Sequence, residues 1–134
     1  MNPVEFLKTI YLGDRFCIKT VVDGFNNQFE FHVNQISRIR DASGEWNYYT
    51  DEDIENGTIV ITDVKKVIFD GSGLIPNDQI YDVYANKIDD TVYEFTFETS
   101  HVDEKAMTHD ITIRVVGESA YLLDPAKPDN RITE

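Results

Sequence analysis

The sequence is poor in cysteine and in basic residues. Its one cysteine, Cys17, has no second cysteine with which to form an internal disulfide. Lys and Arg number 12 against 25 Asp and Glu, which gives a formal net charge of -13. A surface this negative repels phosphate groups, because nucleic-acid binders need Lys and Arg to displace counterions. The composition therefore argues against nucleic-acid binding. It favours a basic protein or a cation as partner, although acidity can also serve solubility alone.

Long apolar runs are also missing. No stretch approaches the roughly 18 apolar residues that cross a bilayer, and no basic region followed by an apolar run marks a signal peptide. We therefore expect a cytoplasmic protein without membrane contact. GxSxG, Walker, GxGxxG, HExxH and CxxC patterns are absent as well. The sequence predicts no catalytic residue, cofactor or metal ligand set, and an enzyme is the least favoured class.

What the sequence does contain is typical of β-structure. Aromatic residues make up 12% of the 134 residues, and Val, Ile and Thr are frequent. The length predicts a single domain, residues 1–134, that is large enough to bury a hydrophobic core. There is no β–α–β alternation and no internal repeat. The fold class that follows is mainly β, an antiparallel β-sandwich or partly closed β-barrel of about eight strands with one short N-terminal helix.

The N-terminal helix is predicted from its capping residues and its spacing. Asn2 can cap the helix, and Pro3 suits the first helical position because its missing N–H would be unpaired there. Apolar residues recur at helical spacing until Gly13, which ends the run; they are Val4, Leu7, Ile10 and Tyr11. A helix of about ten residues is unstable alone, so we expect it to pack on a sheet face or at one end of a barrel.

Alternating apolar residues predict the first two strands. Residues 15–23 place Phe16, Ile18 and Val22 on one face, with Cys17 on the opposite parity. A turn follows at residues 23–27, where Asp, Gly and Asn tolerate positive φ. The return strand, residues 28–39, is the clearer of the two. It has Phe29, Phe31 and Val33 inward, and Glu30, His32 and Asn34 outward. Ile36 has the wrong parity, which indicates a β-bulge or bend near residues 34–35.

Further strands are predicted at residues 58–62, 65–69, 80–88, 92–99, 109–117 and 119–123. The pair 92–99 and 109–117 has the cleanest alternation, so these two segments form the predicted hairpin with the strongest pattern. Asp124 and Pro125 end the last strand, and the residues after them need not be ordered.

The candidate functional segment is the connection at residues 43–57, which joins aromatic and acidic side chains between two glycines. Its predicted binding residues are Trp46, Tyr48, Tyr49, Asp51, Glu52, Asp53 and Glu55. In one interpretation the aromatic residues anchor a contact and the carboxylates select a basic partner. In the other, Trp46 and one tyrosine fold back to close the end of the core.

This segment does not match the sequence pattern of a calcium-binding EF-hand loop. An EF-hand that starts at Asp51 would need Gly at position 6 and Glu at position 12, but these positions hold Asn56 and Thr62. A short helical turn that begins with the acidic residues is the simpler interpretation. Arg38 and Arg40 precede the segment, and an ion pair to its carboxylates is the simplest role for them.

The histidines and the cysteine give only weak signals. His101 and His109 lie at the two ends of one connection, and with Asp103 or Asp110 they could bind zinc, but no compact ligand spacing supports this. Cys17 is expected to behave as a small buried hydrophobic residue, because no local signature accompanies it as a nucleophile.

Two sequence segments carry a family resemblance. The runs ISRIR (residues 36–40) and SGEWNYYTDEDI (residues 43–54) resemble a pattern in a family of short uncharacterised bacterial proteins. The segments PND at 76–78 and DPAKP at 124–128 fit the same pattern, so the resemblance covers nearly the whole chain. It implies no catalytic residue. In general character only, such small acidic proteins are similar to the immunity proteins of toxin systems.

Two functional hypotheses follow. The first is a non-enzymatic acidic binding protein, such as an immunity-type inhibitor of a basic toxin, with residues 46–55 at the contact. The alternative is a β-barrel that binds a small ligand or a divalent cation, with aromatic residues lining its interior. A salt-sensitive complex with a basic protein is expected from the first, and a ligand-dependent melting temperature from the second.

Overall fold

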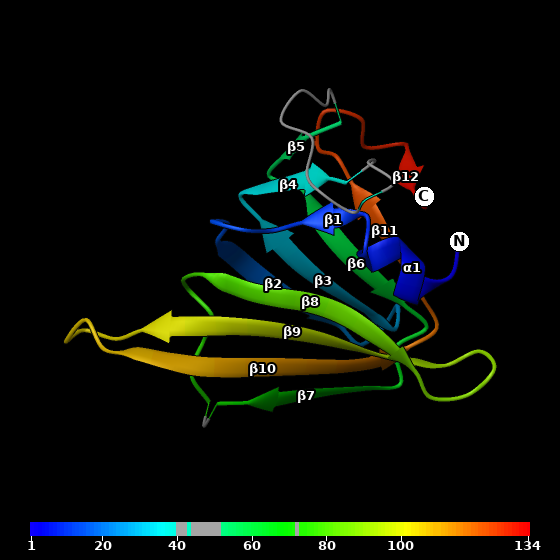
Figure 1. Cartoon of the computed structure of the whole chain (residues 1–134). Helices are drawn as coiled ribbons and strands as arrows, with labels where there is room; N and C mark the ends of the chain where they lie inside the picture. Colours follow the sequence, from blue (N-terminus) through cyan, green and yellow to red (C-terminus); the bar gives the residue numbers. More distant parts are fainter. Residues whose placement is uncertain (40–42, 44–51, 72) are drawn as a thin grey trace.

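The computed structural model describes residues 1–39, 43, 52–71 and 73–134 (Figure 1). This part of the chain is mainly β, with one short helix, α1 (Pro3–Leu7), and three antiparallel sheets. The four-stranded sheet has the order β7 (Lys66–Asp70), β10 (Thr108–Gly117), β9 (Tyr93–Val102), β8 (Ile80–Lys87). The five-stranded sheet has the order β12 (Arg131–Ile132), β11 (Ser119–Leu123), β6 (Thr58–Thr62), β3 (Gln28–Val33), β2 (Cys17–Asp23).

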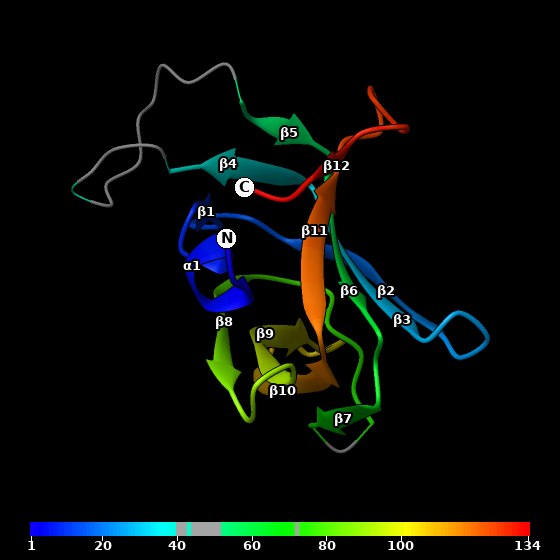
Figure 2. The ribbon, with the colours of Figure 1, turned by 90° about the vertical axis from the view of Figure 1, so that its right-hand side faces the viewer.

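The two larger sheets pack against each other through buried aromatic rings. Phe97 of β9 lies 4.6 Å from Phe31 and 5.5 Å from Phe29, both on β3, between ring centroids. All three side chains are buried. Figure 2 shows the five-stranded sheet standing against the four-stranded one, and neither sheet closes on itself. The architecture is therefore sandwich-like, and of the two predicted alternatives the barrel is wrong. The predicted mainly β class and short N-terminal helix are confirmed.

The helix is shorter than predicted, because strand pairing replaces its second half. Asn2 accepts a hydrogen bond from the Glu5 backbone N–H (2.9 Å), as expected of an N-cap. The helix nevertheless ends at Leu7, and Ile10–Tyr11 forms strand β1, in which Ile10 pairs with Arg38. The helical spacing of Ile10 and Tyr11 therefore did not indicate a helix, because these two residues form a short strand. With five residues, α1 is the one helix that the structure describes, and it is too short to reach across a bilayer.

The prediction that Phe16, Ile18 and Val22 share one face of β2 is wrong, because a bulge at Ile18 separates it from Val22. Phe16, Ile18 and Val22 are 48%, 51% and 55% exposed, whereas Cys17 is buried. The pairing of β2 with β3 shifts by one residue between Cys17 and Lys19, so a bulge reverses the alternation there. In addition, β2 is an edge strand of its sheet, so a side chain on the core side, such as Val22, still reaches water.

The bend predicted near residues 34–35 is confirmed. Strand β3 ends at Val33, and β4 (Gln35–Arg38) leaves the five-stranded sheet for a small sheet of order β1, β4, β5 (Ile54–Glu55). Ile36 is fully buried there despite its parity. The change of sheet explains why one alternation does not fit the whole segment.

The remaining strands occur close to their predicted positions, and the hairpin of β9 and β10 pairs over its full length. The described residues form twelve strands rather than about eight, because very short strands add to the predicted set. The C-terminal segment differs from the prediction. Leu122 pairs with Ile132, so β12 adds to the edge of the five-stranded sheet.

Candidate functional site

The predicted binding segment is only partly within the described residues. Trp46, Tyr48, Tyr49 and Asp51 lie outside them. Glu55 is exposed and sits in β5, where it pairs with Gln35. Glu52 and Asp53 immediately precede β5 and line a cavity. Glu52 lies in a turn and Asp53 leads into β5, whereas residues 50 and 51, at which the predicted helical turn would begin, lie outside the described residues.

Arg38 is the largest buried polar side chain beside this segment, with 2% of its surface exposed. Its Nη2 donates hydrogen bonds to Thr9 Oγ1 (3.1 Å) and to the backbone carbonyl of Glu134 (2.9 Å). Its guanidinium also lies 5.8 Å from the centre of the Phe6 ring. Arg38 thereby joins the N-terminal segment, β4 and the C-terminal segment. This position indicates a bracing role, because a buried guanidinium is stable only where such partners surround it.

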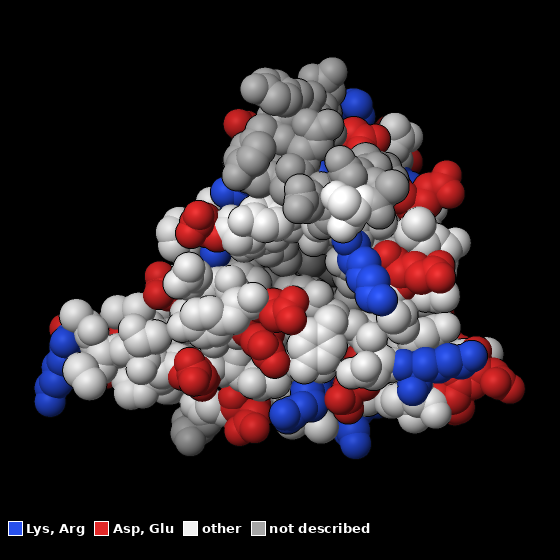
Figure 3. Space-filling view, viewed as in Figure 1, with Lys and Arg blue, Asp and Glu red and all other residues white. Residues whose placement is uncertain are grey.

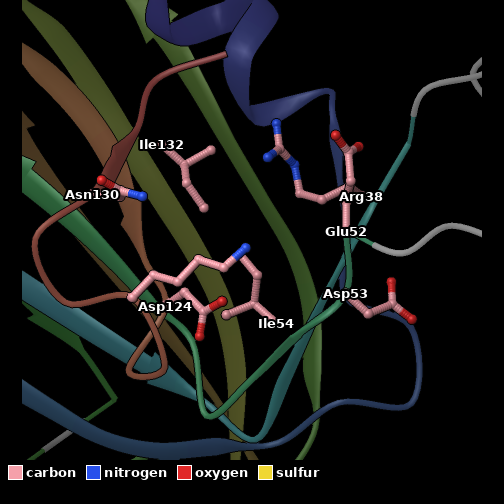
Figure 4. A pocket seen from close by; sticks show the side chains of 8 residues that line it. Arg38, Glu52, Asp53, Ile54, Asp124, Asn130 and Ile132 are labelled. Carbon is pink, nitrogen blue, oxygen red and sulfur yellow. The ribbon is translucent and has the colours of Figure 1, made fainter.

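The cavity at Arg38 has a volume of about 240 Å³. Figure 4 shows Arg38, Glu52 and Asp53 on one side, and Asp124 and Asn130 from the C-terminal segment on the other. Ile54, Lys127 and Ile132 complete the described lining. Gln35 donates a weak hydrogen bond to Asp53 Oδ2 (3.3 Å). Arg38 thus lies beside Glu52 and Asp53, with charges of both signs around one small cavity, and the ion pair expected from the sequence stays a prediction. Arg40 lies outside the described residues.

The outer face of the four-stranded sheet carries acidic residues from three of its strands. Strand register places Asp82 of β8 directly opposite Glu98 of β9, and Glu98 opposite Thr112, whose other neighbour is Asp70 of β7. Glu94 lies on the same face two rows along, beside Asn86, with Thr96 in the row between. We call Asp70, Asp82, Glu94 and Glu98 the acidic row. Like charges directly opposite one another on a sheet destabilise it, so this arrangement costs folding free energy.

Figure 3, in the orientation of Figure 1, shows acidic groups over the part of the molecule formed by this sheet, with basic groups near its margin. One basic group touches the row, since Arg114 Nη1 lies 3.7 Å from Asp70 Oδ2. Both side chains are well exposed, so this pair contributes little to stability.

Tyr84 brings an aromatic ring to the acidic row. Its hydroxyl donates a hydrogen bond to Glu98 Oε1 (3.2 Å). Loss of solvation around the hydroxyl, and then the negative charge of Glu98, raise the pKa of Tyr84 above its ordinary value. Ile68 of β7 lies in the same cross-strand line through Thr96 and Arg114, and it is partly exposed. A partly buried aromatic ring, an apolar side chain and carboxylates therefore share one sheet face.

The outer face of the five-stranded sheet has a different character, because its polar groups pair with one another. Thr58 Oγ1 lies 3.0 Å from His32 Nδ1, and His32 Nε2 lies 2.9 Å from Glu30 Oε1. The carboxylate can only accept, so in neutral His32 the proton is on Nε2 and Nδ1 accepts from Thr58. Glu30, His32 and Thr58, which we call the His32 network, form a carboxylate–imidazole–hydroxyl chain across β3 and β6.

The His32 network forms one wall of a second cavity, of about 440 Å³. Apolar side chains form much of the remaining lining: Ile18, Leu123, Pro125 and Pro128. Lys19 and Asp124 add one charge of each sign. An apolar lining with a few ordered polar groups is typical of small-ligand sites.

The histidines near the β9–β10 turn are adjacent, as the sequence suggested. His101 pairs with His109 across the strands, and their ring centroids are 6.2 Å apart. His109 Nε2 donates to Asp103 Oδ2 (2.8 Å), which holds the pKa of Asp103 below its ordinary value. His101 Nδ1 donates to the Ile75 carbonyl (2.6 Å). Among the described residues, no group of three or more His, Cys, Asp or Glu side chains could hold a metal ion.

Cys17 is buried, and burial raises the pKa of its thiol to about 12. A thiol with such a pKa is almost entirely protonated at neutral pH, so it is a poor nucleophile. This agrees with the expectation that Cys17 is a packing residue.

The sequence contained part of the signal for the His32 network. Glu30 and His32 were expected to point outward from the same strand, and they do. Thr58 could not be added, because only the pairing of β3 with β6 brings it beside His32. The acidic row was missed for the same reason, since its members come from three strands.

The whole chain, residues 1–134, matches a Family of unknown function (DUF6258), and the protein belongs to that family. The family resemblance expected from the sequence is thereby confirmed, while the match carries no activity. Neither a curated protein nor a solved structure matches the chain.

Proposed function

We propose that this protein is a non-enzymatic binding protein whose acidic row contacts a basic protein. The observation that carries the proposal is the placement of Asp82 directly opposite Glu98, with Asp70 two strands further along the same line. An isolated sheet gains no stability from this arrangement. A partner that brings Lys or Arg side chains to the row would relieve the repulsion, so the binding energy includes energy stored in the free protein.

The composition of the face supports a protein partner rather than a free cation. Tyr84 and Ile68 offer contact area beside the carboxylates, and tyrosine is among the residues enriched at interface cores. Arg114 interrupts the negative surface next to Asp70, which gives the face a charge pattern that a matching partner can recognise.

The finer form of the proposal is an immunity-type inhibitor of a basic toxin. It is supported by the net charge of -13 on a chain of 134 residues, which favours rapid association with a basic protein. Trp46, Tyr48, Tyr49 and Asp51 remain proposed contributors to the contact together with Glu52, Asp53 and Glu55. A cytoplasmic location also remains a proposal. A toxin-like gene beside the coding sequence and rescue of cells that express that toxin would support this form.

Affinity capture with charge-matched variants tests the general proposal. The protein is immobilised and exposed to source-cell lysate at low salt, and bound proteins are eluted with rising salt. The row variant is D70N/D82N/E98Q. The control is D90N/E104Q/D129N, which makes the same change in net charge at exposed positions in three different turns. A basic protein that binds the wild type and the control but not the row variant is the expected result.

Equal retention by the row variant and the control would overturn the proposal, because net charge alone would then explain the binding. Retention of no basic protein by the wild type would overturn it as well. Both variants need to unfold cooperatively at a melting temperature no lower than that of the wild type, so that lost binding cannot be due to lost folding.

A second candidate function is the binding of a small amphiphilic molecule in the cavity beside the His32 network. The ordered chain from Glu30 to Thr58 and the apolar lining favour this function. This candidate does not depend on the predicted β-barrel lined by aromatic residues, since the aromatic rings pack together between the two sheets. Thermal melts with a metabolite panel, calcium and zinc test it. A ligand that raises the melting temperature of the wild type but not of His32→Ala would support it, and no shift with any compound would contradict it.

A further inference from the structure

Strand β2 is an edge strand with an open side. In the sheet order its one hydrogen-bonded neighbour among the described residues is β3, over the pairs from Lys19–His32 to Asp23–Gln28. The chain at the beginning of β8 approaches only the start of β2, through a bridge from Phe16 to Gln79 and backbone hydrogen bonds at Arg15 and Cys17. From Lys19 to Asp23, the other side of β2 therefore has backbone groups available to a further strand.

Exposed apolar side chains gather along this edge. Ile18 and Val22 are more than half exposed, and Phe25, in the turn that follows, is 95% exposed. Figure 2 shows the turn between β2 and β3 projecting from the body of the molecule. Protein edges are normally protected by proline, inward charges or a covering segment. This edge has a bulge at Ile18 and a lysine, but no proline within β2.

The sequence of the edge is complementary to itself. Residues 19–23 read Lys-Thr-Val-Val-Asp, with the two opposite charges at equal distances from Val21. Lys19, Val21 and Asp23 pair with outward residues of β3, so all three lie on the solvent face of the sheet. In an antiparallel pair centred on Val21, Lys19 would lie opposite Asp23 of a second copy, and Thr20 opposite Val22.

We propose that β2 pairs in antiparallel register with β2 of a second copy of this chain, about a two-fold axis at Val21. The two five-stranded sheets then become one continuous sheet. Two Lys19–Asp23 pairs form on the solvent face, and the exposed Val22 side chains are covered on the other. This inference does not rest on the proposed function, because the acidic row belongs to the other sheet.

Charge complementarity selects a second copy over an unrelated strand. An arbitrary strand would need opposite charges at the same two positions, whereas symmetry supplies them here. The contact is small compared with the roughly 1,200 Å² or more of stable interfaces, so the dimer is concentration-dependent. Each protomer carries a net charge of -13, so salt that screens this repulsion strengthens the dimer.

Sedimentation velocity over a concentration series tests the proposal, with K19E and its charge-matched control K105E, whose substitution lies in the β9–β10 turn. The wild type is expected to shift to dimer with rising concentration. In K19E two attractive pairs become repulsive, which weakens the dimer by about tenfold or more. In K105E dimerisation remains within about twofold of the wild type. A monomeric wild type up to about 0.5 mM, or equal weakening in both variants, would overturn the proposal.

A cysteine placed on the two-fold axis tests the register directly. Residues opposite each other in antiparallel strands have Cα atoms about 4.5–5.5 Å apart, which a disulfide can bridge. V21C is therefore expected to form a covalent dimer under mild oxidation, while the buried thiol of Cys17 does not react. I68C, on edge strand β7, is the control. Disulfide formation in V21C no faster than in I68C would overturn the register.

Discussion

The outer faces of the two large sheets obey the same alternation and yet differ in how their polar groups are arranged. On the four-stranded sheet, Asp82 and Glu98 lie opposite each other as like charges. On the five-stranded sheet, Thr58, His32 and Glu30 form a chain of hydrogen bonds in which each group complements the next. The first face sets two like charges directly opposite each other, and the second links its polar groups across the strands by hydrogen bonds.

This difference distinguishes a surface suited to binding a partner from a surface whose polar groups stabilise the fold. Carboxylates that repel one another gain free energy when a cation arrives, so the acidic row is suited to protein recognition. A satisfied network gains less from a partner, because a ligand must replace hydrogen bonds that already exist. For this reason the acidic row is the basis of the proposed function, and the His32 network supports only the second candidate.

The largest effect is expected from a substitution in the layer of aromatic rings between the two large sheets, on which both outer faces depend. Phe97→Ala deletes a buried ring that contacts Phe29 and Phe31, so the cavity left behind is expected to cost about 3–5 kcal/mol of unfolding free energy. Urea denaturation followed by circular dichroism measures it. Tyr81→Ala, at a half-exposed position, is the control and is expected to change stability by about 0.5 kcal/mol. A loss below about 1 kcal/mol for Phe97→Ala would contradict the aromatic contact between the sheets.

The same substitution on the two faces should give different results. Thr58→Val removes the hydroxyl that donates to His32 Nδ1 and is expected to cost about 1 kcal/mol, since water can partly replace it. Thr112→Val, in the acidic row line, keeps the β-branched shape and is expected to change stability by less than about 0.5 kcal/mol. Equal effects of the two variants on the free energy of unfolding would remove the distinction between the faces.

Removing one charge from the acidic row should stabilise the free protein. Asp82→Asn keeps an oxygen that can accept from the Val83 backbone N–H and removes the repulsion with Glu98. The expected gain is about 0.5 kcal/mol at low ionic strength, and it should shrink as salt screens the charges. Asp90→Asn, in the β8–β9 turn, is the control for net charge. Thermal melts at two salt concentrations measure the difference, and a salt-independent result would contradict the role of repulsion.

The smallest effect concerns the proton of Tyr84. Its pKa is raised in the folded protein, so the folded state keeps this proton to higher pH than the unfolded state does. This group leaves stability unchanged below pH 10 and lowers it as the pH rises through the folded-state pKa. Absorbance titration of the wild type against Tyr84→Phe isolates the group. Glu98→Gln should lower the pKa of Tyr84 part of the way, because desolvation remains, and an unchanged pKa would exclude the charge of Glu98 as a cause.

Elements with a strong local pattern were predictable. Phe29, Phe31 and Val33 alternate cleanly and are fully buried, and the pair β9–β10 forms the expected hairpin. The predictions that were wrong lie where a distant segment decides the structure. Ile10 is not helical because it pairs with Arg38, and Ile18 does not share a face with Val22 because β2 bulges at the sheet edge.

The candidate site was predictable only in its composition. Glu52 and Asp53 line a cavity with Arg38, and their role in binding stays a prediction. The acidic row and the His32 network could not be found, because each consists of residues that are far apart in the chain. Asp70 and Glu98, for example, are two strands apart in space and share no local motif.

By itself, the sequence determined the β class, the acidic surface and the alternation of its clearest strands, since these depend on residue type and on a period of two. Only the tertiary structure decided which strand lies at an edge, which carboxylates face each other and which hydroxyl reaches His32. The physical reason is that cross-strand neighbours are set by register, and register depends on how the whole sheet packs over its core.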